Sequence, residues 1–182
     1  MALHRENHRR LFFALWPDEA ERAALAEWQP ALQELCGGKA MRSDTLHCTL
    51  VFLGEVAARQ LPALLQLAQG LPCFRFDLCL SEARYWAHNR IVYAAPAGVP
   101  AELAALVAAL EGALHRHRFH FDQRAFQPHI TLLRHARWTA APLPPLPPVC
   151  WQMDDFALVE SVRDEQGARY EVLSRILLPP VE

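Results

Sequence analysis

Lysine is almost absent from this 182-residue chain. Lys39 is the only lysine among its 18 basic side chains, and the rest are arginines. A positive charge excess is also missing, since the formal net charge is −2. This excludes a protein that coats nucleic acid generally, because such proteins carry a strong positive excess. Any nucleic-acid contact is therefore expected to be local. Arginine suits bidentate phosphate contacts, although genomic composition explains the bias more simply.

Recognisable cysteine spacing and long apolar runs are missing as well. Five cysteines include no C-x-x-C pair, which predicts reduced, buried thiols in a cytoplasmic protein rather than a disulfide or zinc framework. No apolar run approaches the roughly 20 residues of a membrane span. The run at 11–16 is too short for a signal peptide and favours a buried strand. With 52% hydrophobic and 21% charged residues, the chain is typical of a folded soluble protein.

Hydrophobic periodicity predicts a mixed order of elements. Strands are expected over 11–16, 46–54, 73–86, 90–97, 127–135, 150–162 and 169–179, with a turn at 164–167 joining the last two, and helices over 17–38, 56–70 and 99–119. Pro30 interrupts the first helical range, so a kink or two shorter helices are both possible. The proline-rich segment 141–149 is expected to be a stiff connector rather than an SH3-type ligand. Hairpins beside helices predict an α+β fold with largely antiparallel sheets.

One tetrapeptide pattern, His-x-Thr-Leu, occurs twice, as HCTL at 47–50 and HITL at 129–132. The two copies lie nearly half a chain length apart and use two of only four threonines. In a strand, residues i and i+2 point to the same face, so each copy offers one imidazole and one hydroxyl side by side. A single copy is a weak signal. Two copies in apolar runs, one closed by Gly54 and one opened by Pro128, are a strong one.

Two such strands facing each other would surround one cavity with the groups that phosphodiester hydrolysis needs. A neutral imidazole takes a proton from the attacking water, and a protonated one gives a proton to the leaving oxygen. Hydroxyl donors stabilise the charge that develops on the non-bridging oxygens. The ordinary histidine pKa of about 6.5 makes both forms available near neutral pH. The doubled motif therefore predicts metal-independent acid/base chemistry on a phosphate ester.

The strings LHCTLVFLGEV at 46–56 and FQPHITLLR at 126–134 resemble the 2H phosphoesterase superfamily, in particular its LigT-like RNA 2′,3′-cyclic phosphodiesterase branch, once named 2′-5′ RNA ligase. RRLFFALWP at 9–17 and the late FALVES and YEVL fit the same pattern. The resemblance implies one bilobal α+β domain over residues 1–182, with pseudo-twofold symmetry and both motifs in a central cleft. It also implies opening of a 2′,3′-cyclic phosphate to a 2′-phosphate by a cytoplasmic monomer without metal or cofactor.

Carried onto this sequence, the resemblance makes His47 the general acid toward the leaving 3′ oxygen and His129 the general base for water. Thr49 and Thr131 become phosphate donors, and the near-symmetry leaves the two histidine roles exchangeable. Arg134 matches an arginine of the family's cleft. A regular strand would turn Arg134 away from His129, so the role requires the strand to end or bulge before it.

The partner implied is RNA, or an oligonucleotide, with a 2′,3′-cyclic phosphate end, and neither DNA nor a membrane. Reversible 2′-5′ ligation, hydrolysis of another cyclic nucleotide and a non-catalytic RNA-binding module are the alternatives. Two titrating imidazoles argue against the last, because binding alone does not require them.

Two weaker features complete the sequence. Phe52, Tyr85 and Trp86 could stack a terminal base, although core packing is expected for at least two of them. The stretch 114–124 is rich in histidine and arginine. It predicts a solvated helix end, with a basic RNA-binding rim at Arg116 and Arg118 as an alternative. A metal site of His115, His117 and His120 is the least favoured interpretation, because suitable acidic or cysteine ligands are missing.

Overall fold

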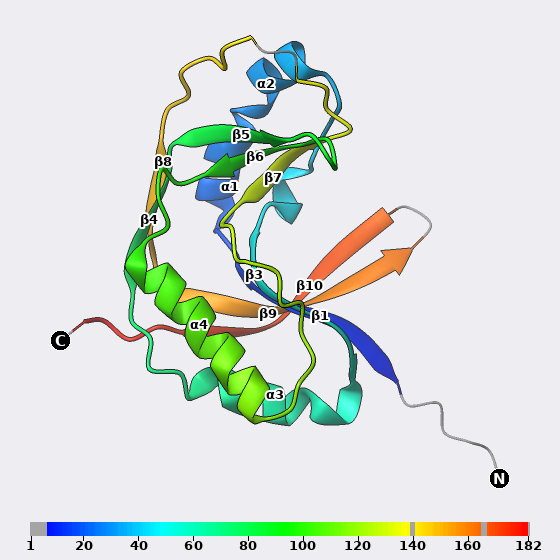
Figure 1. The fold of residues 1–182 in the computed structure, drawn as a ribbon, viewed down its shortest axis with the longest axis vertical. Coiled ribbons are helices and arrows are strands. Elements are labelled where there is room, and N and C mark those ends of the chain that lie inside the picture. The colour runs from blue at the N-terminus through cyan, green and yellow to red at the C-terminus, as the bar shows by residue number, and fades with distance from the viewer. Residues whose placement is uncertain (1–6, 139–140, 165–166, 182) are drawn as a thin grey trace.

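Two four-stranded antiparallel sheets form the two lobes of the protein (Figure 1). The computed structural model describes residues 7–138, 141–164 and 167–181. The first sheet has the order β10-β9-β1-β3 and the second β2-β7-β6-β5. Their strands are β1 (His8–Leu15), β3 (Cys48–Ala57), β9 (Asp155–Asp164), β10 (Gly167–Leu177), β2 (Lys39–Ala40), β7 (Ile130–Arg134), β6 (Ile91–Ala95) and β5 (Glu82–Trp86). The predicted bilobal, antiparallel α+β fold is confirmed.

Helices cover both sheets, and two of them pack on the sheet other than the one that precedes them in the chain. The helices are α1 (Glu19–Ala26), α2 (Gln29–Cys36), α3 (Leu61–Gln69) and α4 (Ala101–Arg116). α2 follows β1 of the first sheet yet packs on β2 and β7 of the second. α4 follows β6 of the second sheet yet packs on β3 of the first, beside α3 (Figure 1). The chain therefore passes repeatedly between the lobes.

Local signals account for several helix boundaries. Asp18 caps α1, its carboxylate accepting from the backbone N–H groups of Ala20 and Glu21. Pro30 lies in the first turn of α2, where its missing N–H costs nothing, so the predicted long helix is two helices. The helix predicted over 56–70 is shorter, because β3 runs on to Ala57 and a 3₁₀ turn (Ala58–Gln60) precedes α3.

A two-stranded sheet of β4 (Phe76–Leu80) and β8 (Val149–Met153) connects the lobes. β4 leads through Ser81 into β5 of the second sheet, and β8 leads through Asp154 into β9 of the first. The single strands predicted over 73–86 and 150–162 are thus wrong: each is two strands in different sheets. Alternating hydropathy continues through both junctions, so it does not reveal the change of partner. The connector prediction is confirmed, since 141–148 has no regular structure.

The pairing of β4 with β8 also corrects the expectation that all cysteines are reduced and buried. Cys79 lies directly opposite Cys150, with their Cα atoms 4.0 Å apart, and the two form a disulfide. Both side chains are exposed, whereas Cys36, Cys48 and Cys73 are free and buried as expected. The partners are separated by 71 positions, so short spacing motifs do not detect them.

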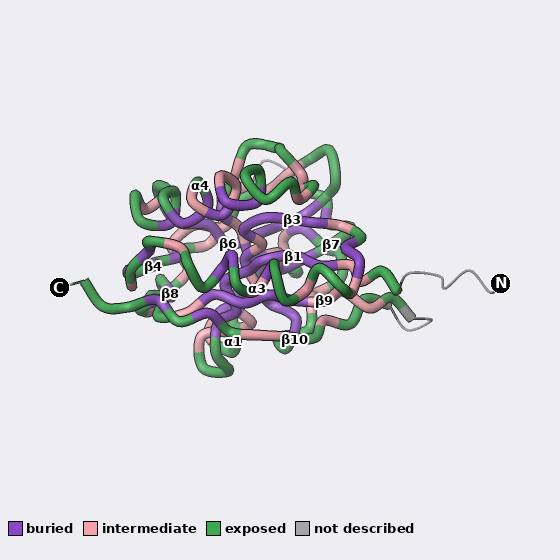
Figure 2. The backbone as a smooth tube through the Cα atoms, turned by 90° about the horizontal axis from the view of Figure 1, so that it is seen from below, coloured by how far each residue is buried: buried purple, intermediate pink, exposed green. Residues whose placement is uncertain are grey.

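One hydrophobic core runs through both lobes. A single buried cluster joins Phe13 and Leu15 of β1 to Leu132 and Leu133 of β7 and to Leu110 of α4. Figure 2 shows the buried backbone concentrated in β1, β3 and β9, between exposed outer segments. No helix of the described residues is long and apolar enough to cross a membrane. The turn predicted at 164–167 includes residues 165–166, which lie outside the described residues.

Candidate active site

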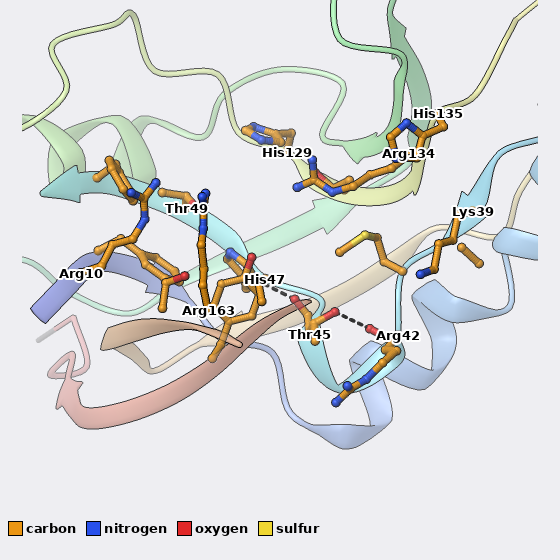
Figure 3. A pocket seen from close by; sticks show the side chains of 18 residues that line it. Arg10, Lys39, Arg42, Thr45, His47, Thr49, His129, Arg134, His135 and Arg163 are labelled. Carbon is orange, nitrogen blue, oxygen red and sulfur yellow. Dashed lines mark hydrogen bonds between the residues drawn. The ribbon is translucent and has the colours of Figure 1, made fainter. Parts of the chain in front are cut away.

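A pocket of about 710 Å³ lies where β3 of the first lobe contacts β7 of the second (Figure 3). Eighteen described residues line it, and none of these is aspartate or glutamate. Three are histidines, and five are cationic: Arg10, Lys39, Arg42, Arg134 and Arg163. Although the chain is slightly acidic overall, positive charge is concentrated in this pocket, which therefore suits an anion. This agrees with the expectation that any nucleic-acid contact would be local.

Both copies of the His-x-Thr motif face this pocket. His47 and Thr49 line it from the first lobe, and His129 and Thr131 line it from the second. Each histidine stands immediately before its strand, since β3 begins at Cys48 and β7 at Ile130. The histidines are thus one residue outside the strands in which they were predicted, but they keep the expected side. The structure brings all four motif side chains to one cavity.

The two imidazoles are held by the same hydrogen bond. Nδ1 of His47 lies 2.7 Å from the carbonyl oxygen of Thr45, and Nδ1 of His129 lies 2.8 Å from that of Gln127. A carbonyl oxygen can only accept, so each Nδ1 carries the hydrogen and donates it. In the neutral ring this leaves Nε2 with a lone pair, free to exchange a proton with a ligand.

Aromatic rings pack against each imidazole. Trp16 stacks on His47 with centroids 5.0 Å apart and an interplanar angle of 11°, and Tyr170 meets it edge-on at 4.9 Å. Trp86 meets His129 edge-on at 4.6 Å, and Tyr93 does so at 5.8 Å. The ring orientations are therefore fixed before any substrate binds, which lowers the cost of reaching a reactive geometry.

Burial favours the neutral form of both histidines in the free protein. It lowers the pKa of His47 from 6.5 to about 4, against the opposing effect of the Thr45 carbonyl, and the charges of His129 and Arg134 lower it further. Burial also lowers the pKa of His129, opposed by the Gln127 carbonyl and assisted by Arg134. A bound phosphate anion would favour the protonated form of either ring and raise its pKa.

Each motif is followed by the same irregularity in its strand. After Thr49, both Leu50 and Val51 are buried, and the pairing of β3 with β1 shifts register between Phe13 and Ala14. After Thr131, both Leu132 and Leu133 are buried, and the pairing of β7 with β6 shifts between Val92 and Tyr93. An extra residue in a strand returns the following side chain to the face it would otherwise leave.

The fifth residue after each histidine consequently faces the pocket. These residues are Phe52 in the first lobe and Arg134 in the second, and both line the cavity. The bulge that the sequence required for Arg134 is present in β7. Phe52 supports a cation, since the guanidinium carbon of Arg10 lies 4.7 Å from its ring centroid. Figure 3 shows Arg134 extending toward His129.

The remaining candidates lie elsewhere. Tyr85 donates its hydroxyl to the carbonyl of Ala136 and packs against Trp138. Trp86 supports His129 without lining the pocket. These two aromatics therefore serve packing, as expected for at least two of the three.

The basic stretch at 114–124 does not line the pocket, although the backbone N–H of Asp122 donates to the carbonyl of Phe52, which does. Arg116 and His117 line a separate pocket together with residues of α3, and Arg118 lines neither of the two pockets. The exposure of Arg116, His117 and Arg118 agrees with a solvated helix end, and the rim interpretation stays a prediction. Within the described residues, no group of three or more His, Cys, Asp or Glu side chains could hold a metal, and this includes His115, His117 and His120.

Sequence reasoning missed four of the cationic side chains in the pocket. Arg10 comes from β1, Lys39 from β2, Arg42 from the loop before the first motif and Arg163 from β9. Their positions in sequence carry no shared spacing. Only the rarity of lysine marks Lys39 in advance.

A family model described as the 2′-5′ RNA ligase superfamily matches residues 16–165. The chain belongs to this superfamily. Among its curated relatives, the RNA 2′,3′-cyclic phosphodiesterase of Escherichia coli K12 is 34% identical over 168 residues, covering 91% of this chain and 94% of the relative. The protein of the same name from Thermus thermophilus is 35% identical over 182 residues, covering 93% of this chain and 90% of the relative.

A solved structure of the superfamily has the same fold. The crystal structure of Escherichia coli LigT in apo form superimposes with a TM-score of 0.85 at 32% sequence identity, covering 94% of this chain and 98% of LigT. The bilobal arrangement is therefore a property shared with this relative over almost the whole length of both chains.

Proposed function

We propose that this superfamily member hydrolyses 2′,3′-cyclic phosphate ends of RNA to 2′-phosphates, using two histidines and no metal. The observation that carries the proposal is the presence of His47 and His129 in the same pocket. Two imidazoles from two lobes, each with its Nδ1–H engaged, line one cationic pocket without carboxylates. The names of the Escherichia coli and Thermus thermophilus relatives support the substrate class.

In the proposed reaction, Nε2 of His129 takes a proton from water as the water oxygen attacks phosphorus. The bond from phosphorus to the 3′ oxygen breaks, and Nε2 of His47 supplies the proton to that oxygen. The product carries a 2′-phosphate and a free 3′ hydroxyl. Each proton transfer of this kind contributes about 10²–10⁴ in rate. The following turnover needs only the exchange of one proton between the two rings and solvent.

Charge on the phosphoryl oxygens is stabilised by Thr49, Thr131 and Arg134. The two hydroxyls approach from opposite lobes, because Thr49 and Thr131 belong to strands of different lobes. Each faces the pocket on the same side as its histidine. Arg134 adds a planar fork of N–H donors, which fits two phosphate oxygens at once. Donors fixed in this way stabilise the transition state more than water could.

The anionic substrate also supplies the acid form of His47. In the free protein burial holds the pKa of His47 near 4, so the ring is neutral at pH 7. A bound phosphate beside it favours the imidazolium. The proton needed by the leaving oxygen is therefore acquired together with the substrate.

The substrate must be RNA rather than DNA, because a 2′ hydroxyl is needed to form the cyclic ester. The proposal takes residues 1–182 as one bilobal unit that acts as a monomer. The single hydrophobic cluster through both lobes supports this unit.

The test is incubation with an oligonucleotide that ends in a 2′,3′-cyclic phosphate, with and without EDTA, followed by identification of the terminal phosphate. We expect a 2′-phosphate at the same rate in both conditions, because the described residues offer no metal-ligand cluster. Loss of activity in EDTA with recovery in a divalent cation would refute the two-histidine mechanism. A 3′-phosphate product would refute the assignment of the leaving oxygen.

A further inference from the structure

Lys39 stands directly opposite Arg134 in the pairing of β2 with β7. Both side chains line the pocket (Figure 3). Like charges placed directly opposite each other on neighbouring strands destabilise a sheet. The described residues provide no ion-pair partner for either cation, and no carboxylate lines the pocket. An anion between or beside them would remove this repulsion.

The two-residue strand β2 is held firmly in this position. Gly38 has φ +87°, and a Cβ there would lie 2.6 Å from the carbonyl oxygen of Arg134, so only glycine permits the approach. The buried side-chain amide of Gln29 donates to the carbonyls of Met41 and Leu132, at 2.8 and 3.0 Å. Lys39 is therefore presented on a fixed backbone rather than on a loose loop.

The pocket has two chemically different ends. At one end lie Arg10 and Arg163, with Arg10 over the ring of Phe52, and Phe12 and Tyr170, whose rings meet edge-on, line the pocket as well (Figure 3). At the other end the cations Lys39 and Arg42 accompany no aromatic side chain other than His135. Figure 3 shows Arg10 and Arg163 on one side of His47, and Lys39 and Arg42 on the other. Arg42 is engaged by Asp44, to which its Nε donates at 3.0 Å, so Lys39 carries the uncompensated charge of its end.

The end of an RNA chain has a matching asymmetry. The 2′ and 3′ oxygens of the terminal ribose share the cyclic phosphate. The base is attached to C1′ of the same ribose, and a second phosphate is attached at C5′. The base is a flat apolar surface suited to aromatic and guanidinium faces. The 5′ phosphate is a compact anion suited to an ammonium group.

We propose that Lys39 binds the phosphate on the 5′ side of the terminal ribose, while Arg134 binds the reacting phosphate and the base lies toward Phe52. This inference rests on the proposed function and adds a second phosphate site to it. It makes the preferred substrate class a nucleoside 2′,3′-cyclic phosphate that carries a 5′ phosphate, as the 3′-terminal nucleotide of an RNA chain does.

The test is a binding measurement that needs no turnover. Adenosine 2′-phosphate and adenosine 2′,5′-bisphosphate are titrated by calorimetry into the wild type, Lys39→Gln and Lys39→Arg, at about 0.1 M salt to screen long-range attraction. We expect the bisphosphate to bind the wild type about tenfold more tightly, the usual scale for one charged hydrogen bond. Lys39→Gln should lose this preference and Lys39→Arg should keep most of it.

A matched control is Arg116→Gln, which removes one positive charge at the outer end of α4 and should leave the preference intact. Equal binding of both ligands to the wild type, or an unchanged preference in Lys39→Gln, would overturn the inference. Loss of the preference in Arg163→Gln alone would place the 5′ phosphate at the opposite end and would also overturn it. A protein that keeps the preference but does not hydrolyse cyclic ends would refute the proposed function and still support the second site.

The wild type allows a second measurement, because Lys39 is the only lysine in the sequence. An amine-selective acetylating reagent can modify no other side-chain amine. We expect adenosine 2′,5′-bisphosphate to slow acetylation of Lys39, and adenosine 2′-phosphate at equal occupancy to leave it unchanged. Equal protection by the two ligands would contradict a contact with the 5′ phosphate.

Discussion

The two lobes present their imidazoles in the same way and differ in the residue that follows. In each, a histidine precedes its strand, donates from Nδ1 to the carbonyl two residues earlier and is followed by a threonine and a bulge. The fifth residue after the histidine then faces the pocket as Phe52 in one lobe and Arg134 in the other. In the proposed mechanism, the repeated part supplies the pair of proton-transfer groups.

The divergent part gives the pocket a direction. Phe52 lies under the guanidinium of Arg10, whereas Arg134 lies opposite Lys39. A cyclic-ended nucleotide has a base on one side and a phosphate on the other, so a symmetric pocket would bind it in two orientations. Under the proposed function, the different groups at the two ends would select a single orientation, and this would decide which imidazole meets the leaving oxygen.

Removing either member of the repeated pair should have the largest effect. We expect His47→Ala and His129→Ala each to lower kcat by about 10²–10⁴, because each removes a proton-transfer group. The double variant should be only slightly slower than the worse single variant, since the two groups act as a unit. The measurement is single-turnover hydrolysis of a cyclic-ended oligonucleotide, with circular dichroism to verify folding. A folded single variant with near wild-type kcat would remove that histidine from the mechanism.

Changing the divergent pair should have intermediate effects that differ between the lobes. We expect Arg134→Lys to lower kcat/KM on a cyclic mononucleotide by about tenfold to a hundredfold, because an ammonium group cannot reproduce the planar fork. Phe52→Leu should mainly raise KM, by less than about tenfold, because it removes a stacking surface. Arg118→Gln is the control, with an expected change below about twofold at 0.1 M salt. Wild-type activity in Arg134→Lys would show that Arg134 is not a phosphate ligand.

Much of this comparison is present in the sequence. The doubled motif places both histidines and both threonines, because a period of two fixes which side chains share a strand face. The need for a bulge before Arg134 also follows from that period. The matching bulge before Phe52 does not follow from the sequence, because an aromatic side chain at this position could equally well pack in the core.

The rest of the site depends on contacts between distant segments. Arg10, Lys39 and Arg163 come from three strands whose meeting is decided by sheet order, and local patterns do not encode sheet order. The disulfide between Cys79 and Cys150 could not be predicted from the sequence for the same reason. The position of α4 is a third example, since its periodicity shows a helix without showing which sheet it covers.

The smallest expected effect is the influence of His47 on how the free energy of unfolding changes with pH. The folded-state pKa of His47 is about 4, below the 6.5 of an ordinary histidine, because burial disfavours its charged form. As pH falls from 6.5 toward 4, the unfolded chain gains a proton that folded His47 does not, so stability is lost across this range. We expect the wild type to lose about 1–2 kcal/mol more than His47→Gln between pH 7.5 and pH 5.

The measurement for this pH effect is the free energy of unfolding in urea, taken for both proteins at both pH values. Equal losses in the two proteins would show that the pKa of His47 is the same in the folded and unfolded states.

The repeated crossing of the chain between lobes has a consequence for cooperativity. Cutting the sequence near residue 100 would leave β1 and β3 without β9 and β10, and β2, β5 and β6 without β7. Neither fragment would contain one whole sheet, even though the motifs fall one in each half. Half-sites related by repetition are therefore not independent folding units. We therefore expect the two imidazoles to come together only when the whole chain folds.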